Sequence, residues 1–333
     1  MNKTIIPIFI LTALAAILIA VSLSLVPLKP PVLTAGLSAK ITKPKEQTYT
    51  KILFVGDIML DRGVKYYSEK NSGNDFVFSA KGGPASGWET LSDFLKSQDL
   101  VAANLEGPIT ENKSISITAK MESPESFFFT FDPSWAETLS KNNIKLVNLG
   151  NNHILNFSGE GLQSTKKYLT EAGIDYFGSP DNPKSIVKEI NGIKISFISY
   201  NEFSTYRNIE ADMTIKEIQE AEDTSDIVVV FCHWGVEYSA EPSNAIKEIG
   251  RQFIDNGADL VIGTHPHVIQ PIEVYKGKRI YYSLGNFIFD QYFSEETKKG
   301  MGVILKINDQ NKKLEFEEIN FYMQSNSQTI ITE

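Results

Sequence analysis

The stretch "GADLVIGTHPHVIQ" (257–270) holds two of the four histidines of this chain, His265 and His267, with Pro266 between them. An apolar run leads directly into the pair, and such a run is typical of a buried strand. In open α/β sheets, ligand sites lie just beyond the carboxyl ends of the strands. We therefore expect both imidazoles at the end of a buried strand, where they can take part in a shared site.

Other apolar runs of the chain also end in polar side chains. The residues at these positions are Asp57, Asn104, Glu106, Asn151, Asn152, His153, His233, Asn286 and Asp290. Taken alone, each has an ordinary structural explanation, such as a turn cap for Asp57 or a core position for His233. All four histidines of the chain nevertheless follow predicted strands, so we favour one shared site. Imidazole, carboxylate and amide oxygens suit a divalent metal such as Mn, Fe or Zn.

Strand-like and helix-like segments alternate from residue 51 onward. The predicted strands are 51–55, 99–104, 144–149, 194–199, 226–232, 258–262 and 279–284. Amphipathic patterns predict helices at 86–98, 158–173 and 243–257, and the segments 301–308 and 313–323 alternate at period two. This order predicts a layered α/β domain that ends in antiparallel strands.

Composition narrows the class of protein. Hydrophobic residues make up 42% of the 333 residues and charged residues 22%, which is typical of a globular protein. The net charge of −9 repels phosphate backbones, so we expect no nucleic-acid partner. The single cysteine, Cys232, rules out an internal disulfide framework, and its place within an apolar run predicts a buried thiol.

The first 28 residues differ from the rest of the chain. No charged residue occurs from Thr4 to Leu28, a stretch long enough for a membrane span. We favour an uncleaved transmembrane anchor over a cleaved signal peptide, because the segment is long and its cleavage signal is poor. Residues 29–50 then form a stalk, and 51–333 form the main domain. We expect a single-pass protein of the cell membrane with that domain outside the cytoplasm.

Six motifs also carry a family resemblance. They are "GDIMLDR" (56–62), "NLEGPIT" (104–110), "NLGNNHILNFSGEGL" (148–162), "HWGVEY" (233–238), "GADLVIGTHPHVIQ" (257–270) and "YSLGNFIFDQ" (282–291). Together they resemble the CapA family of poly-gamma-glutamate capsule biosynthesis proteins, which is related to calcineurin-like metallophosphoesterases. The resemblance implies a four-layer αββα sandwich with a centre of one or two metal ions at the strand ends.

The resemblance also assigns roles to individual residues. It implies the metal ligands Asp57, Glu106, Asn152, His233, His265 and His267. It implies that His153 acts as a general acid or steadies the transition state. Arg62 either pairs with an anionic group of the substrate or is an ordinary solvated charge.

Three positions depart from the metallophosphoesterase pattern. Met59 stands where a ligand histidine is expected, and Glu106 replaces the bridging aspartate. Asn156 stands where the family often has aspartate. The first departure removes a nitrogen ligand, which puts one metal position in doubt.

Two functions of different kinds remain open at this point. The first is an anchored, metal-dependent hydrolase of phosphoesters or amides that acts in poly-gamma-glutamate or envelope polymer biosynthesis, on an anionic polymer or an envelope phosphoester. The second is a non-catalytic tethered subunit that works beside capsule-synthesis membrane proteins. A metal-free sugar-binding module is a third possibility, and it would contain no metal at all.

Overall fold

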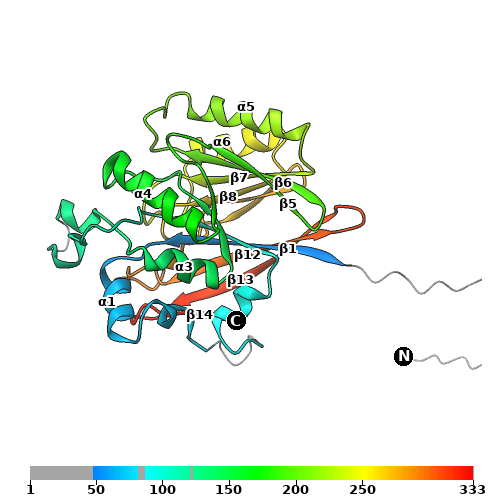
Figure 1. The fold of residues 1–333 in the computed structure, drawn as a ribbon. Helices are drawn as coiled ribbons and strands as arrows, with labels where there is room; N and C mark the ends of the chain where they lie inside the picture. The colour runs from blue at the N-terminus through cyan, green and yellow to red at the C-terminus, as the bar shows by residue number, and fades with distance from the viewer. Residues whose placement is uncertain (1–47, 82–86, 121–122, 333) are drawn as a thin grey trace, which may run out of the picture. The chain divides into compact units, whose positions relative to one another are not determined.

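Two β-sheets form the body of the protein (Figure 1), and the computed structural model describes residues 48–81, 87–120 and 123–332. In the first sheet, β1 (Tyr49–Ile58), β2 (Leu100–Leu105) and β3 (Ile144–Asn148) are adjacent and parallel. The strand order is β14-β13-β12-β1-β2-β3-β4, and β11 pairs with the end of β1. The remaining strands are β4 (Asp175–Phe177), β11 (Asn286–Ile288), β12 (Lys299–Asn308), β13 (Leu314–Met323) and β14 (Thr329–Thr332).

The second sheet has the strand order β5-β6-β7-β8-β10-β9. Its strands are β5 (Ser185–Ile190), β6 (Ile193–Asn201), β7 (Ile227–His233), β8 (Leu260–Thr264), β9 (Ile272–Tyr275) and β10 (Lys278–Tyr281). The strands β6, β7, β8 and β10 run parallel, and β5 and β9 close the two edges in the antiparallel sense. Strand β10 ends at Tyr281, earlier than the predicted strand 279–284. Ser283 Oγ accepts a hydrogen bond from Gly285 N, and the chain turns there.

Alternate side chains of the central strands enter two different apolar clusters. On β1, Ile52 and Phe54 pack in the cluster between the sheets, whereas Leu53 and Val55 pack in the outer cluster. A strand that is buried on both faces must be apolar along its whole length, and each buried aliphatic side chain contributes about 1.5–3 kcal/mol. The predicted α/β domain is therefore confirmed as a mixed fold with two sheets.

Helices cover the outer side of each sheet (Figure 1). The helices are α1 (Arg62–Lys70), α2 (Leu91–Lys96), α3 (Ser134–Lys141), α4 (Ser158–Glu171), α5 (Glu210–Glu222) and α6 (Asn244–Asp255), with 3₁₀ turns η1 (Asn74–Phe78), η2 (Ser116–Thr118) and η3 (Pro124–Phe127). Buried residues of α2, α3 and α4 join the outer cluster of the first sheet, and those of α5 and α6 join the outer cluster of the second.

Helix α2 is shorter than the helix predicted at 86–98. It begins after Thr90, because the Thr90 hydroxyl accepts a hydrogen bond from Asp93 N while the Asp93 carboxylate accepts from Thr90 N. This reciprocal pair satisfies two backbone donors at the helix start and fixes it at that point. The predicted helices at 158–173 and 243–257 correspond to α4 and α6, which end two residues earlier than predicted.

The predicted membrane anchor (1–28) and residues 29–47 of the predicted stalk lie outside the described residues. Within the described part of the chain, no helix has both the length and the apolar character to cross a bilayer. The described residues belong to one compact unit, 46–333. The division of the chain into anchor, stalk and domain stays a prediction.

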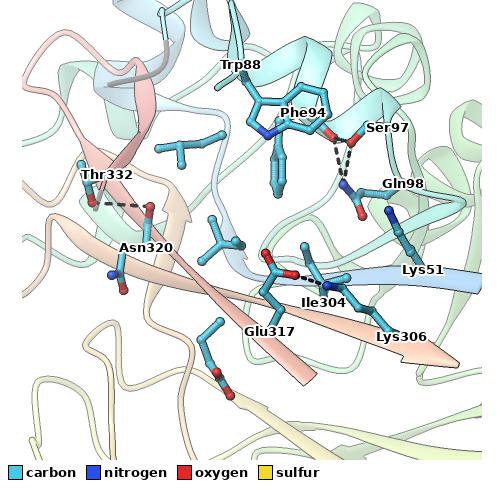
Figure 2. Close-up of a pocket in the computed structure, with 13 residues that line it drawn as sticks. Lys51, Trp88, Phe94, Ser97, Gln98, Ile304, Lys306, Glu317, Asn320 and Thr332 are labelled. Carbon is cyan, nitrogen blue, oxygen red and sulfur yellow. Dashed lines mark hydrogen bonds and ion pairs between the residues drawn. The ribbon is translucent and has the colours of Figure 1, made fainter. Parts of the chain in front are cut away.

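A pocket of about 340 Å³ opens on the outer side of the first sheet, between α2 and strands β12 to β14 (Figure 2). Trp88 and Phe94 form one wall, with their ring centroids 5.6 Å apart. Lys51 also lines it and precedes Asp57 by six positions along β1. At about 3.3 Å per residue, this pocket lies about 20 Å from the carboxyl end of β1, where the polar residues gather.

Candidate metal centre

The carboxyl ends of the parallel strands of both sheets meet at one edge. Asp57 is the penultimate residue of β1, Glu106 follows β2, and His233 ends β7. His265 and His267 follow β8. Two groups of three side chains have ligand atoms that lie within 4.8 Å of one another. They are Glu106, His265 and His267, and Asp57, Glu106 and His233. The side chains predicted to converge do so, and they form a candidate metal centre.

The Asp57 carboxylate is buried and is shared between the two sheets. Its Oδ1 accepts a hydrogen bond of 2.8 Å from Asn104 Nδ2. Its Oδ2 accepts one of 3.1 Å from the backbone N of His265 and lies 3.2 Å from His267 Nδ1. Asp57 is therefore held in place at the meeting point of β1 and β8.

Glu106 is fully buried, and neither of its carboxyl oxygens has a hydrogen-bond partner among the described residues. Its Oε1 lies 3.5 Å from His267 Nε2 and 3.9 Å from His153 Nε2. Burial, together with the nearby Asp57 charge, raises the pKa of Glu106 well above its usual value. An unpartnered buried carboxyl is costly unless a cation compensates it, so the donor set fits a metal ion at this position.

Hydrogen bonds fix the tautomer of His267. Its Nδ1 lies 2.9 Å from Asn286 Oδ1, and the Asn286 amide nitrogen donates to Gln291 Oε1 and to the Thr297 carbonyl at 3.0 Å each. The Asn286 oxygen is therefore an acceptor, and Nδ1 of His267 carries the proton. The lone pair of Nε2 then faces Glu106, which is the arrangement of a metal-binding imidazole with a fixed partner behind it.

His233 is oriented in a similar way. Its Nδ1 lies 3.1 Å from Thr264 Oγ1, and that hydroxyl donates to the Cys232 carbonyl at 2.9 Å. Asn104 Nδ2 also lies 3.2 Å from Nδ1, so two contacts hold the ring with Nε2 pointing outward. Nε2 lies 2.8 Å from Asn152 Oδ1 and 3.2 Å from His265 Nδ1. Four other predicted ligands thus lie beside these two rings. Asp57 and Glu106 lie beside His267, and Asn152 and His265 lie beside His233.

Burial also controls the charge of these imidazoles. It lowers the pKa of His265 to about 3 and holds the pKa of His233 well below its usual value, with neighbouring imidazoles as a further cause. Both rings are neutral at neutral pH, and the neutral imidazole is the form that binds a metal ion.

His265 and His267 have an unusual backbone conformation. Their φ angles are 94° and 57°, in the left-handed region that favours glycine. A non-glycine residue held there costs about 1–3 kcal/mol, and such residues cluster at functional sites. The conformation lets His265 N donate to Asp57 while both rings reach the centre.

His153 faces the centre from the loop after β3. Its Nδ1 lies 3.0 Å from Asn156 Oδ1, and Asn156 Nδ2 donates to the Phe127 carbonyl at 3.4 Å. Nδ1 therefore carries the proton, and Nε2 faces Glu106. Burial lowers the pKa of His153 to about 4, and its ring packs 4.5 Å from the Phe129 ring. Asn156 thus still orients His153 although it replaces the aspartate.

Arg62 lies at the start of α1 and is already paired. Its guanidinium forms an ion pair with Asp290 and donates to the Ser126 carbonyl at 3.1 Å. It also lies over the Phe129 ring, 4.9 Å from the centroid. Its Nε is buried and has no partner among the described residues. The structure therefore places Arg62 as a held side chain beside the centre and not as a solvated charge.

Met59 does not take the place of the missing histidine. Its side chain is buried in the outer cluster of the first sheet, and its sulfur lies 3.1 Å from the backbone N of Asp61, which donates to it. Cys232 also points away from the centre, into the outer cluster of the second sheet. The thiol is buried, as predicted.

Asn104 has a role that the sequence did not reveal. Its Nδ2 lies 2.8 Å from Asp57 Oδ1 and 3.2 Å from His233 Nδ1, so it joins the two sheets. Its Oδ1 accepts from Asn148 and Asn151 at 3.2 and 3.3 Å. Its position at the end of an apolar strand was visible in the sequence, but this bridging role depends on how the sheets pack.

Comparisons with known proteins identify the family of the chain. Residues 51–291 match the model of the family described as bacterial capsule synthesis protein PGA_cap. The chain is 31% identical over 274 residues to the PGA biosynthesis protein CapA of Bacillus subtilis, covering 76% of this chain and 68% of that protein. It is 30% identical over 277 residues to the capsule biosynthesis protein CapA of Bacillus anthracis, covering 75% of this chain and 62% of that protein.

A solved structure shares the fold. The crystal structure of a novel phosphatase from Mycoplasma pneumoniae aligns with a TM-score of 0.50 and 16% sequence identity. The alignment covers 83% of this chain and 94% of the phosphatase. At this identity the likeness concerns the arrangement of strands and helices alone.

Proposed function

The chain belongs to the PGA_cap family of bacterial capsule synthesis proteins, and on that basis we propose that it is a metal-dependent hydrolase in poly-gamma-glutamate or envelope polymer biosynthesis. The bond that it cleaves is a phosphoester or an amide. The fold is of the metallophosphoesterase type, a four-layer αββα sandwich. The likeness to the phosphatase from Mycoplasma pneumoniae supports this fold assignment only.

The observation that carries the proposal is the state of Glu106. Both of its oxygens are buried without hydrogen bonds, and they face imidazole nitrogens and the Asp57 carboxylate. Two ionised carboxyl groups buried side by side repel each other, so a cation between them favours ionisation of both, and without it one of them takes up a proton more readily. The residues that would hold one or two divalent ions, of the Mn, Fe or Zn type, are Asp57, Glu106, Asn152, His233, His265 and His267.

A divalent cation at this centre would supply Lewis-acid chemistry, which lowers the pKa of water and stabilises negative charge as it develops. The side chains of this protein then complete the reaction. His153 Nε2 faces Glu106 at 3.9 Å with a free lone pair, so it can accept a proton at the reacting bond and then return it. Asn156 keeps this nitrogen aimed at the centre by accepting the proton of Nδ1.

Arg62 supplies a fixed positive charge beside the centre. Its pairing with Asp290 and its packing over Phe129 hold the guanidinium in one orientation. A guanidinium so held can donate its remaining N–H groups to an anionic oxygen of the substrate at little further entropic cost. In this role it binds and orients the substrate.

The cellular setting is also part of the proposal. The uncharged segment from Thr4 to Leu28 supports a membrane anchor, with the domain outside the cytoplasm. There it would meet an anionic polymer or an envelope phosphoester and neighbouring capsule-synthesis membrane proteins. The net charge of −9 gives no reason to expect nucleic acid as a substrate.

A second function is supported by one observation. Met59 is packed in the core and supplies no ligand in place of histidine. A centre with fewer nitrogen ligands can hold its metal for structural purposes alone, which would suit a non-catalytic tethered subunit for polymer assembly or export.

Elemental analysis and a phosphoester assay on the full-length chain distinguish these functions. The hydrolase is expected to contain about one or two equivalents of divalent metal and to cleave bis(p-nitrophenyl) phosphate, with both properties reduced in His267→Ala. Bound metal without turnover on any phosphoester or amide of the envelope supports the subunit. A protein that binds no metal contradicts both functions.

A further inference from the structure

A groove of about 300 Å³ begins at the metal centre and is formed by the loops after β4 and after β6. Asn152 belongs to both sites, since it lines the groove and its Oδ1 lies 2.8 Å from His233 Nε2. Phe203, on the loop after β6, packs its ring 4.3 Å from the ring of His265. A substrate group in this groove is therefore next to the bond that reacts at the centre.

The groove carries no net charge. Its lining includes one cation and one anion, Lys184 and Glu210, and these two form an ion pair that is largely buried. Ser204 donates a second hydrogen bond to Glu210, at 2.9 Å. Since Asp57 and Glu106 lie close by and the whole chain has a net charge of −9, a polyanion gains no attraction here.

The lining of the groove is rich in neutral polar groups whose hydrogen-bond donors or acceptors are available to a ligand. Among the described residues, no hydrogen bond is made by Nδ2 of Asn152 or Asn201, by the side-chain amide of Asn182 or by the hydroxyl of Thr205. Carboxamides and hydroxyls both donate and accept hydrogen bonds. They therefore match a ligand that carries many neutral hydroxyl or amide groups.

Two exposed aromatic side chains stand beside these groups. Phe203 is 41% exposed and Tyr206 is 56% exposed, and both line the groove. Large exposed aromatics next to a catalytic centre offer flat apolar faces for a ligand. A sugar ring has an apolar C–H face and a rim of neutral hydroxyls, so it fits both the aromatic and the polar part of the lining.

We propose that this groove binds a neutral sugar unit of the substrate, so that the bond cleaved at the metal centre lies next to a glycan and not within a bare polyanion. This inference rests on the proposed hydrolase function for its consequence, but the groove itself can be tested by binding alone.

The test measures binding of defined probes to the full-length chain by calorimetry, with and without added Mn²⁺. The probes are neutral tetrasaccharides of glucose, galactose and N-acetylglucosamine, a γ-linked glutamate tetramer and a neutral tetrapeptide. At least one tetrasaccharide is expected to bind about tenfold more tightly than the glutamate tetramer or the peptide. Tyr206→Ala is expected to weaken that binding by about tenfold, since it removes a stacking face.

Trp88→Ala is the matched control. Trp88 is also a partly exposed aromatic that lines a pocket with mixed polar and apolar walls, but this pocket (Figure 2) lies on the outer side of the first sheet. Its loss is expected to leave sugar binding unchanged. Equal or tighter binding of the glutamate tetramer or of the peptide, or a loss of sugar binding in Trp88→Ala alone, overturns the proposal.

Hydrolysis of bis(p-nitrophenyl) phosphate is measured in the same preparations, so that the two proposals can fail separately. Turnover without binding of any tetrasaccharide overturns the groove assignment and leaves the hydrolase standing. Sugar binding that depends on Tyr206, without turnover, supports the groove and contradicts the hydrolase.

Discussion

The two sheets contribute different chemistry to the metal centre. The first sheet delivers oxygen atoms, from the carboxylates of Asp57 and Glu106 and the amide of Asn152. The second delivers nitrogen atoms, from His233 and from the pair that follows β8. The oxygen side has two neighbouring buried carboxyl groups, and Glu106 lacks hydrogen bonds among the described residues, whereas burial keeps the rings of His233 and His265 neutral.

This difference shows how a cation would be selected and placed. The carboxyl oxygens supply the attraction for a cation, and the ordered imidazoles supply the directional lone pairs. Neither sheet can form the centre alone, so the apolar cluster that packs the sheets together is also part of the site. The predictions that follow test this division, from the largest expected effect to the smallest.

The first sheet supplies oxygen ligands and the second supplies nitrogen ligands, and His153 is the exception, because this imidazole follows β3 of the first sheet. If it moves a proton and binds no metal, His153→Ala should lower turnover by about 10²–10⁴-fold while metal content is unchanged. Turnover of a phosphoester and elemental analysis of the same sample measure the two effects. Parallel loss of turnover and metal would make His153 a ligand and end the simple division by sheet.

Glu106→Gln tests the oxygen side. We expect metal affinity to fall by more than about 100-fold, because even changes behind the ligands cost about 10–100-fold. Above the raised pKa of Glu106, the metal-free variant should be more stable than the metal-free parent, because the parent must then keep a buried carboxylate without hydrogen bonds.

Metal titration and urea unfolding measure the two effects of Glu106→Gln. The exposed Glu137 provides the control Glu137→Gln, which should change neither quantity. A metal-free variant that is less stable than its parent would show that Glu106 has favourable partners in solution.

Removal of the metal should weaken the interaction between the oxygen side of the centre, on the first sheet, and the nitrogen side, on the second. At a free metal concentration of 100 times the Kd, bound metal stabilises the fold by about 2.7 kcal/mol, or about 4–5 °C in Tm for a domain of this size. Thermal unfolding with and without a chelator measures this change. An unchanged Tm at saturating metal would mean that no ion binds the folded centre.

Asn104→Ala tests the link between the two sides. The variant loses the hydrogen bonds to Asp57 and to His233, so we expect metal affinity to fall by about 10–100-fold and the free energy of unfolding by about 1–3 kcal/mol. Asn142→Ala is the control, since Asn142 is equally buried but bonds only within α3 and its end. A loss of stability without a loss of affinity would limit Asn104 to a structural role.

The strands were predictable because a strand buried on both faces leaves an apolar run in the sequence. The ligand positions were predictable for a related reason, since the polar residue that ends such a run lies at the edge of the sheet. The prediction of one shared site from His233, His265 and His267 needed no knowledge of strand order, because parallel strands bring their carboxyl ends together.

Other features depend on packing between distant segments and were not predictable. The ion pair of Arg62 with Asp290 joins residues 228 positions apart. The lack of hydrogen bonds at Glu106 is a property of its whole environment. The direction of the Met59 side chain depends on the core that receives it. The start of α2 directly after Thr90 is set by local capping chemistry. The longer apolar pattern around it made the predicted helix too long.

The left-handed backbone at His265 and His267 has a consequence for engineering. A campaign that selects variants only for heat tolerance, in metal-depleted medium, should accumulate glycine at both positions, since glycine adopts this conformation without a steric penalty. The resulting proteins would melt later and bind no ion. We therefore expect histidine to be retained at 265 and 267 only where metal binding, and not thermal stability alone, is under selection.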